Sequence, residues 1–392
     1  MLMALLSLGT WIGPAHGRVN HIAALERECD RTIPGLLQDN GVPGMALGLV
    51  VDGQVAWTKG YGLANTKTGA KVTPDTVFQA ASISKSISAW VVMRLVEARR
   101  VDLDAPVARY LKRWQLPASR FDPAGVTLRR LLSHTAGLNV PGYGGFPPGV
   151  PLQSLTQSLT AAADAGGQGL AVVAAPGSTW QYSGGGYTLA QLLVEDVTGQ
   201  PFAAYTRSAI LAPLGMHASR LDQPSAAAAR AATSYDRAGR VAPDDRFTAQ
   251  AAAGLRTTVR DLARFVAAAM PNSNGEAAGR GLLRPATVVE MLTPQPNSAT
   301  DLIFQGSDWG LGYGLKHLPT RGQQLIFHPG DNIPGWHGLI AAIPAERVGL
   351  VALMNGEAGR ALRVQVCCLW LRAHGEHALA ECQPPTSNAT RQ

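Results

Sequence analysis

The stretch of the sequence best suited to covalent chemistry is FQAASISKSISAW, residues 78–90, in which Ser82 stands three positions before Lys85. Residues at positions i and i+3 share one face of a helix, so the two side chains could form a hydrogen bond. A serine hydroxyl becomes a good nucleophile when a neighbour takes its proton, and a buried lysine of lowered pKa can do so. At a helix start, the Ser82 N–H could also bind an oxyanion. Ordinary amphipathic helices show the same spacing, so other motifs must decide.

Three further stretches carry residues that suit this chemistry. WQYSGGGYTLAQLL places Tyr182 before a glycine run that opens a helix, where its phenol could carry a proton. FHPGDNIPGWHG places Gly330 on or beside a strand, against which a substrate backbone could lie. SHTAGL holds His134 in a tight turn, and a structural role is expected for it. Trp180 and Trp336 could line a cleft or pack in the core, and both interpretations stay open.

The elements that must position these residues follow from the spacing of apolar side chains. Helical spacing predicts helices over 18–40, from Ser82 onward and over 357–373, with more helices in the middle of the chain. Alternating β-rich runs predict hairpins around Asp52-Gly53 and across Pro344 to Arg347. Strands near both ends can join one antiparallel sheet, with the middle helices as a second lobe. The sequence therefore predicts a two-lobed α+β fold.

The predicted boundaries divide the chain into four parts. Residues 1–17 are apolar and end in small residues, which is typical of a secretory signal, although a buried N-terminal segment is the alternative. The sheet lobe is expected over about 18–75 and 310–374, and the helical lobe over about 76–309. Residues 375–392 are polar and expected to be disordered. These features predict export, to the periplasm or outside the cell, and no other stretch is long and apolar enough for a transmembrane helix.

Composition narrows the class of partner. The 392 residues carry a formal net charge of +7, but the arginines are scattered and no nucleic-acid-binding motif is present, so no nucleic acid is expected. The four cysteines lack the paired spacing of a zinc site, and neither a metal nor a cofactor is predicted. Whether Cys29 pairs with Cys367 or Cys368 stays open, as does the oligomeric state. The expected partner is a small molecule or peptide that carries an acyl group.

Taken together, these motifs resemble those of the class C serine β-lactamases, the penicillin-binding DD-peptidases and their esterase and peptidase relatives. The resemblance runs over about residues 20–372. It implies the fold of that family, an antiparallel sheet flanked by terminal helices beside a mostly helical lobe. It also implies that Ser82 is the nucleophile, that Lys85 is its proton-shuttling partner and that Tyr182 is the general base.

The resemblance extends to the strand beside the site. His328 and Gly330 match the family's Lys/His-x-Gly motif, and the family's oxyanion hole implies the backbone N–H groups of Ser82 and Asp331. Some stretches look closer still to peptidases that remove an acylated D-asparagine leader from nonribosomal peptide prodrugs. That likeness implies that Asn332 contacts a polar side chain of the substrate.

Three departures from the family pattern bear on the substrate. Gly184 stands where many β-lactamases carry a substrate-binding asparagine, Pro329 replaces a small hydroxyl residue, and His328 replaces the lysine. Altered anchors should change the substrate rather than the mechanism, because a site built to hydrogen-bond one group rejects ligands that lack it. Efficient β-lactam hydrolysis is therefore not expected.

The function predicted from the sequence is a serine hydrolase that cleaves an amide or peptide bond, for instance in an N-acyl-D-amino-acid peptide, through an acyl-enzyme. The alternative is a carboxylesterase of the same family. A β-lactamase, or a binding protein for peptidoglycan or peptides without catalysis, ranks below both. A Ser-His-Asp hydrolase is not supported, because the chain lacks a Gly-x-Ser-x-Gly elbow.

Overall fold

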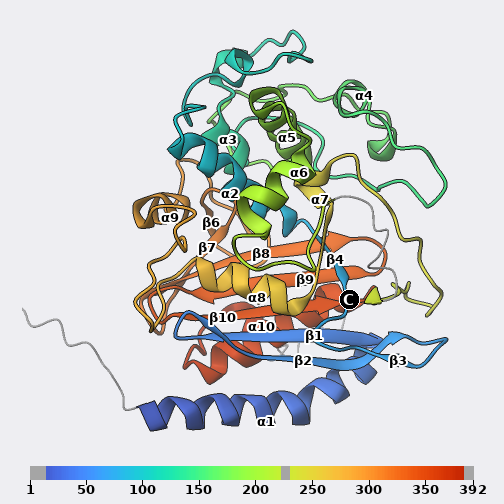
Figure 1. The fold of residues 1–392 in the computed structure, drawn as a ribbon, viewed down its shortest axis with the longest axis vertical. Coiled ribbons are helices and arrows are strands. Elements are labelled where there is room, and N and C mark those ends of the chain that lie inside the picture. The colour runs from blue at the N-terminus through green and yellow to red at the C-terminus, as the bar shows by residue number, and fades with distance from the viewer. Residues whose placement is uncertain (1–14, 222–229, 384–392) are drawn as a thin grey trace, which may run out of the picture.

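The computed structural model describes residues 15–221 and 230–383. An eight-stranded antiparallel sheet with the order β3-β2-β1-β10-β9-β8-β7-β6 lies between two layers of helices (Figure 1). The strands are β1 Gly44–Val51, β2 Gln54–Asn65, β3 Ala70–Lys71, β6 Asp308–Trp309, β7 Gly314–Leu318, β8 Gln323–Asn332, β9 Trp336–Ile343 and β10 Val348–Met354. Met45 of β1 pairs with Met354 of β10, so the two ends of the chain share one sheet. This confirms the predicted α+β fold.

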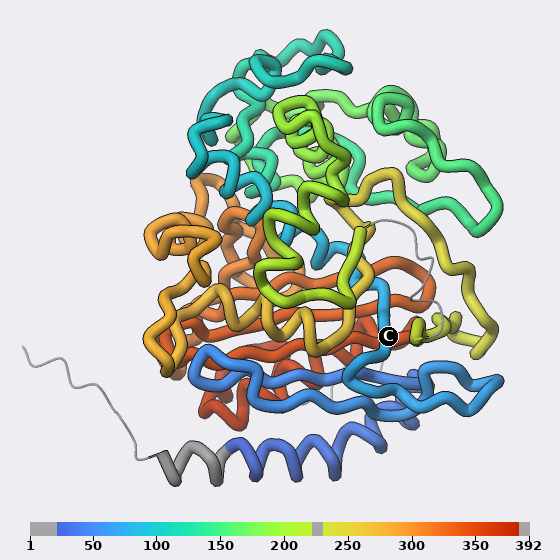
Figure 2. Tube along the Cα trace, viewed as in Figure 1, coloured from blue at the N-terminus to red at the C-terminus, as the bar shows by residue number. Residues whose placement is uncertain are grey.

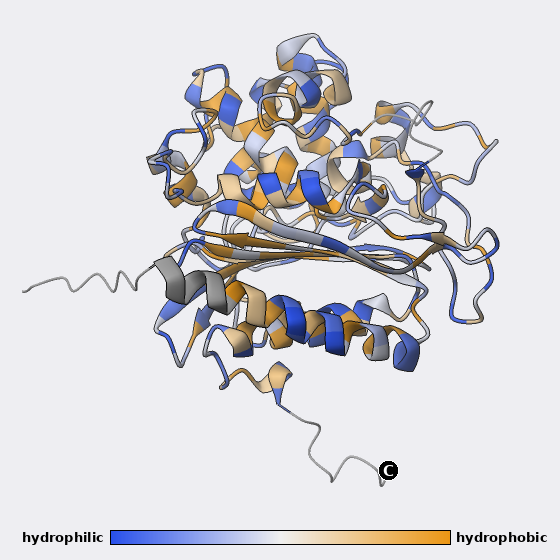
Figure 3. Cartoon of the chain, turned by 60° about the horizontal axis from the view of Figure 1, so that its bottom comes forward, coloured by the Kyte–Doolittle hydropathy of each residue, from blue (hydrophilic) through white to orange (hydrophobic). Residues whose placement is uncertain are grey.

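Two terminal helices, α1 Ala15–Asn40 and α10 Gly359–Ala373, cover one face of the sheet. Seen from the side in Figure 3, they form the layer below the strands, and the helical lobe lies above them. Leu25, Cys29 and Ile33, which share the apolar face predicted for the first helix, are buried. The hairpin at Asp52-Gly53 also forms, with positive φ angles at both residues.

The sheet is apolar on both faces because each face meets a hydrophobic core. Met45, Leu47 and Leu49 of β1 belong to the core beneath the terminal helices, whereas Ala46 and Val50 belong to the core shared with the helical lobe. Alternate side chains of a strand point to opposite faces, so a sheet covered twice needs apolar residues at nearly every position.

The helical lobe holds the middle of the chain, which the trace in Figure 2 follows from cyan to yellow. Its α-helices are α2 Ser84–Glu97, α3 Leu128–Leu132, α4 Leu155–Thr160, α5 Gly184–Thr198, α6 Phe202–Thr206, α7 Gln250–Ala253 and α9 Pro285–Met291. Short helical turns lie at Val107–Arg109, Pro123–Gly125, Ala163–Ala165 and Arg207–Leu211. A small sheet of β4 Phe78–Ala81 and β5 Leu255–Thr257 connects this lobe to the large sheet.

One helix lies on the other side of the predicted lobe boundary. The helix α8 Val259–Ala268, capped by the Thr258 side chain, falls within the range expected for the helical lobe. It packs instead on β1, β2 and β10 of the large sheet (Figure 1). Small residues of the strands allow this approach, since Gly48 meets the Val259 side chain and Gly349 meets that of Val266.

The C-terminal segment differs from the predicted disordered tail. Residues 375–383 are ordered, with a helical turn at Ala380–Cys382 and a disulfide between Cys382 and Cys368. Glu376 is buried and accepts a hydrogen bond from the Thr320 hydroxyl at 2.8 Å. The rest of that tail, residues 384–392, lies outside the described residues, as does most of the predicted signal segment.

The disulfide also settles the open question of cysteine pairing. Cys29 and Cys367 are buried free thiols, so neither joins the two terminal helices.

Among the described residues, no helix is long and apolar enough to cross a membrane.

Candidate active site

Ser82 lies in the turn between β4 and α2, two residues before the helix begins. The preceding residue, Ala81, has a positive φ of 50°, which turns the chain sharply from the strand. Ser84 braces the turn, because its hydroxyl accepts a hydrogen bond from the Leu255 N–H at 2.9 Å. The prediction of a helix starting near Ser82 is therefore correct to within two residues.

Lys85 is almost completely buried, and its amine contacts the Ser82 hydroxyl. The Nζ to Oγ distance is 3.0 Å, and Nζ also donates to the carbonyl oxygen of Ala252 at 2.8 Å. Burial lowers the pKa of Lys85 from 10.5 to about 7, because the charged amine loses its hydration. Near neutral pH a large fraction of the amine is therefore uncharged and able to accept the Ser82 proton.

Tyr182 lies on the other side of the Ser82 hydroxyl. It lies two residues before α5, whose N-terminus is capped by the Ser183 side chain accepting from the Gly186 N–H at 3.0 Å. Lys85 Nζ lies 4.9 Å from the centroid of the Tyr182 ring. Burial raises the pKa of Tyr182, and hydrogen bonding with Ser82 opposes this only in part. The phenol stays protonated at neutral pH, so it is a proton donor in the resting site.

The rings of His134, Trp180 and Trp309 pack against the Tyr182 ring. The His134 ring lies 4.3 Å from the Tyr182 ring between centroids, and its Nδ1 accepts from the Ser183 N–H at 3.2 Å. Trp180 and Trp309 complete an aromatic cluster around it. Burial lowers the pKa of His134 far below its usual range, so the imidazole is neutral and its contacts are those of a structural residue. Trp336, in contrast, packs edge-on against Phe78 outside this cluster.

Strand β8 forms the remaining wall. It pairs with β7 only as far as Phe327, so residues 328–332 have a strand partner on the β9 side alone. Gly330 permits a close approach to β4, because a Cβ there would lie 2.2 Å from the carbonyl oxygen of Ala80. Strand β8 is thus pressed against the strand that leads into Ser82, a placement that suits an oxyanion hole made from the N–H groups of Ser82 and Asp331.

His328 is fully buried and cannot supply a positive charge near neutral pH. Its Nδ1 lies 2.7 Å from the carbonyl oxygen of Pro329, which can only accept, so Nδ1 carries the proton. Burial and the neighbouring charge of Lys85 lower the pKa of His328 to about 3. The family's lysine at this position is therefore replaced by a neutral ring, whose centroid lies 5.3 Å from that of the Trp309 ring.

The side chain of Asp331 is held by Arg363 and His337. Its Oδ1 lies 2.6 Å from Nη1 of Arg363 and 2.6 Å from Nδ1 of His337. Burial alone would raise the pKa of Asp331, but the hydrogen bond with His337 and the charge of Arg363 outweigh it and lower the pKa to about 2. Arg363 also donates to the carbonyl oxygen of Gly330 at 3.2 Å, so the ion pair fixes the backbone of the strand at this point.

The amide nitrogen of Asn332 is bonded within the protein, and Gly184 has no side chain to offer a substrate. The Asn332 side chain is buried and donates to Gln79 Oε1 at 2.7 Å and to the carbonyl oxygen of Ala253 at 3.3 Å. These two bonds occupy the amide nitrogen of Asn332, and the contact of its side chain with a substrate stays a prediction. At Gly184 a Cβ would lie 3.1 Å from the carbonyl oxygen of Pro141, so segment 141–143 fills the space of the family's asparagine.

The structure thus brings Ser82, Lys85 and Tyr182 together, as the three motifs predict, with β8 beside them. It also shows participants that the motifs do not reveal. The carbonyl of Ala252 and the side chains of Arg363 and Trp309 contact this site from distant parts of the chain. The sequence holds no local signal for these contacts, because each joins residues that lie far apart in the chain.

Comparison with known proteins agrees with this geometry. A β-lactamase of Lysobacter lactamgenus is 28% identical over 357 residues, which cover 85% of this chain and 87% of that protein. Esterase EstB of Burkholderia gladioli is 33% identical over 205 residues, covering 50% of this chain and 51% of the esterase. The structure of the octameric penicillin-binding protein homologue from Pyrococcus abyssi superposes with a TM-score of 0.72 at 26% identity, covering 91% of this chain and 79% of that one. The family model named Beta-lactamase matches residues 29–365. The chain therefore belongs to the β-lactamase family and is a serine hydrolase of that family.

Proposed function

We propose that this hydrolase cleaves an amide or peptide bond through an acyl-enzyme on Ser82. The observation that carries the proposal is the 3.0 Å contact between the Ser82 hydroxyl and the buried Lys85 amine, whose pKa lies at about 7. A base of this pKa is matched to proton transfer at neutral pH. A binding protein without catalysis would have no need to bury an amine beside a hydroxyl at such a cost.

Acylation begins when the Ser82 oxygen attacks the carbonyl carbon of the substrate while its proton moves to Lys85 Nζ. The carbonyl oxygen becomes an oxyanion, which the backbone N–H groups of Ser82 and Asp331 stabilise. Removal of one such donor typically costs about 3 kcal/mol in the barrier. Asp331 takes part through its backbone, and its side chain anchors the strand through Arg363.

The tetrahedral intermediate collapses when the bond from carbon to the leaving nitrogen breaks. The Tyr182 phenol, hydrogen-bonded to Ser82, donates its proton to that nitrogen, and the Lys85 ammonium returns a proton to the phenolate. Water then attacks the ester on Ser82 by the same steps in reverse, which releases the acid. This assignment makes Lys85 the base and Tyr182 the acid during acylation, whereas the resemblance alone implied a tyrosine base.

The walls of the site support an amide other than a typical β-lactam. His328 is neutral and Gly184 has no side chain, so neither provides the charge or the amide with which drug-hydrolysing relatives hold their substrates. We therefore propose a linear amide, such as an N-acyl-D-amino-acid peptide, as the substrate. His328 and Gly330 would line its binding edge on β8.

A carboxylesterase is the second candidate. It is favoured by the likeness to esterase EstB and by the bare Gly184, since an ester has no N–H to be recognised. The same three side chains would perform the reaction, with an alcohol as leaving group.

Two measurements test these proposals. Ser82→Ala should abolish labelling by a fluorophosphonate probe, and labelling that persisted would mean that another residue is the nucleophile. A comparison of an acyl p-nitrophenyl ester with an acyl-D-amino-acid amide ranks the two substrate classes. A large preference for the ester, after correction for the intrinsic reactivity of the two bonds, would reverse the ranking.

We also propose that the protein works in the periplasm or outside the cell. The Cys368–Cys382 disulfide supports this location, since such bonds persist in oxidising compartments. A fusion of residues 1–30 to a reporter that is active only after export tests this location. A reporter that stayed inactive in the cytoplasm would contradict it.

A further inference from the structure

The one-turn helix α7 is the support on which Lys85 rests. The carbonyl oxygen of Ala252 accepts from Lys85 Nζ at 2.8 Å, and that of Ala251 accepts from the Ser88 hydroxyl at 2.9 Å. The carbonyl oxygen of Ala253 accepts from Asn332 Nδ2 at 3.3 Å. A helix of four residues has no stability of its own, so its position depends on such outside contacts. Whatever holds α7 also holds the hydrogen-bond acceptor of Lys85.

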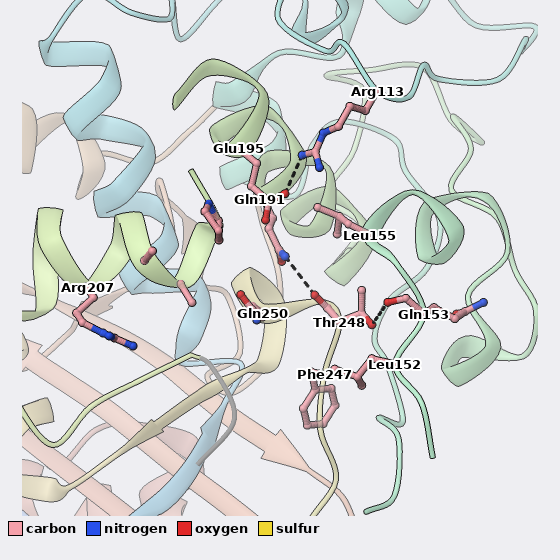
Figure 4. Close-up of a pocket in the computed structure, with 13 residues that line it drawn as sticks. Arg113, Leu152, Gln153, Leu155, Gln191, Glu195, Arg207, Phe247, Thr248 and Gln250 are labelled. Atoms are coloured by element: carbon pink, nitrogen blue, oxygen red, sulfur yellow. Dashed lines mark hydrogen bonds and ion pairs between the residues drawn. The ribbon is translucent and has the colours of Figure 1, made fainter. Parts of the chain in front are cut away.

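Gln191 holds α7 through two hydrogen bonds to its backbone and to the segment before it. This glutamine lies on α5, the helix that begins just after Tyr182, and only 3% of its surface is exposed. Its Oε1 accepts from the Ala251 N–H at 3.0 Å, and its Nε2 donates to the carbonyl oxygen of Thr248 at 3.1 Å. Both ends of one buried amide therefore bind the backbone of α7 and of the segment that leads into it (Figure 4).

An open cavity lies directly behind α7. Its volume is about 490 Å³, and its walls include Arg113, Gln191, Glu195, Phe247, Thr248 and Gln250 (Figure 4). Gln250 is the first residue of α7 and faces this cavity, whereas Ala252, in the same turn, binds Lys85. The short helix thus separates the cavity from the buried amine. Because burial is what keeps the pKa of Lys85 low, water entering past α7 would raise it.

We infer that Gln191 is a positioning residue for the reaction, which clamps α7 so that the short helix holds Lys85 and keeps water from the cavity away from it. This inference rests on the proposed role of Lys85 as the base. Gln191 does not touch the reacting atoms and acts through α7 alone. No motif of the family assigns this task to it.

The experiment compares Gln191→Met with wild type in the dependence of kcat/KM on pH, using an acyl p-nitrophenyl ester between pH 5.5 and 9. Methionine keeps the length of the side chain and removes both hydrogen bonds. We expect the acid limb of the profile to move up from about pH 7 by roughly one pH unit. A base whose pKa rises by one unit loses about tenfold of its neutral form at pH 6, so activity there should fall about tenfold. Above pH 8.5 the variant should approach wild type.

Gln295 offers a matched control. It is also a buried glutamine beside an open cavity, and its Nε2 donates to the carbonyl oxygen of Thr293 at 3.0 Å. Its Oε1 accepts from Arg129 Nη1 at 3.3 Å, so its hydrogen bonds go to residues outside α7, and Gln295→Met should keep the acid limb where wild type has it. An equal displacement in both variants would show a general loosening of the lobe and would overturn the inference.

Gln191→Glu provides a second, independent readout. An ionised carboxylate can still accept from the Ala251 N–H, but it cannot donate to the carbonyl oxygen of Thr248, whereas a protonated one can. Its activity relative to wild type should therefore rise as the pH falls, opposite to the trend for Gln191→Met. This variant decides the matter if Gln191→Met does not fold.

The outcomes separate this inference from the proposed function. If Lys85→Met kept near-normal turnover, the proposed mechanism would fail, and the role of Gln191 with it. If Lys85→Met were inactive while folded Gln191→Met kept the wild-type acid limb, only the inference about Gln191 would be overturned.

Discussion

Replacing Lys85 by methionine should make the protein more stable while it abolishes activity. The pKa of Lys85 falls from 10.5 to about 7 on folding, a difference of about 3.5 pKa units. Each pKa unit corresponds to about 1.4 kcal/mol, so at pH values below 7 the buried amine costs the fold about 5 kcal/mol. At pH 7 about 4 kcal/mol of this remains.

Part of that gain is lost with the two hydrogen bonds of the amine. Methionine cannot donate to the carbonyl oxygen of Ala252 or contact the Ser82 hydroxyl, and each lost bond costs about 1 kcal/mol. Lys85→Met should therefore be more stable than wild type by about 2 kcal/mol at pH 7. Lys85 would then be a residue that the activity requires although it lowers the stability of the fold.

The pH dependence carries the sharper test. Between pH 7 and 10.5 the unfolded chain binds a proton at Lys85 that the folded chain has released, so the stability of wild type rises with pH in this window. By pH 9 the cost of the buried amine has fallen to about 2 kcal/mol, which the two lost hydrogen bonds cancel. The difference between Lys85→Met and wild type should therefore shrink from about 2–3 kcal/mol at pH 6 to near zero at pH 9.

Urea denaturation followed by tryptophan fluorescence at pH 6, 7, 8 and 9 measures this difference. Lys67→Met, on the exposed turn between β2 and β3, reports the effect of removing a lysine from the surface. A difference between Lys85→Met and wild type that stayed constant from pH 6 to 9 would refute the reasoning. It would mean that the amine keeps its charge on folding and that another group accepts the Ser82 proton.

Three further substitutions test the walls of the site. Tyr182→Phe should lower kcat for the amide at least ~10²-fold if the phenol protonates the leaving group. The loss should be smaller for a p-nitrophenyl ester, because its leaving group needs no proton. Equal losses for the two substrates would contradict a role of Tyr182 as the acid. Gly330→Ala places a methyl group 2.2 Å from the carbonyl oxygen of Ala80, so it should push β8 away from Ser82. This displacement should lower kcat/KM at least ~10²-fold. A near-normal kcat/KM would show that β8 is not part of the site. Asp331→Asn should destabilise the fold at pH 7, because Arg363 stays buried without its charge partner. The Asp331 carboxylate stabilises the fold above its unfolded pKa of 3.8 and loses that effect as the pH falls toward about 2, so wild type and Asp331→Asn should converge in acid melting curves.

Much of the fold could be predicted because its signals are local. The hairpin at Asp52-Gly53 and the pair Ser82 and Lys85 each lie within a few residues of one another, and the apolar period of α2 makes its face visible. Tyr182 is equally visible, because a glycine run that opens a helix is a short pattern. The prediction that strands from both ends of the chain share one antiparallel sheet is also confirmed, and the structure adds that β1 pairs with β10.

The parts that escaped prediction depend on contacts between distant residues. The acceptor of Lys85 is a backbone carbonyl 167 positions away, and any residue type can supply one. Nothing in the sequence places Gln79 beside Asn332, so the hydrogen bond between their side chains could not be predicted. Cys367 and Cys368 are neighbours on one helix but point in different directions, so only the structure shows that Cys368 meets Cys382 and that Cys367 faces the core.

The pairing of β1 with β10 has a consequence for how the protein is made. The central pairing of the sheet sets Met45 opposite Met354, so it cannot form until residue 354 has left the ribosome. Contacts over such sequence separations close slowly, and the first hairpin must wait with one edge unpaired. The sheet therefore cannot close before β10 has been made, and such a delay would suit the proposed export, because a chain must be unfolded to be threaded through a membrane.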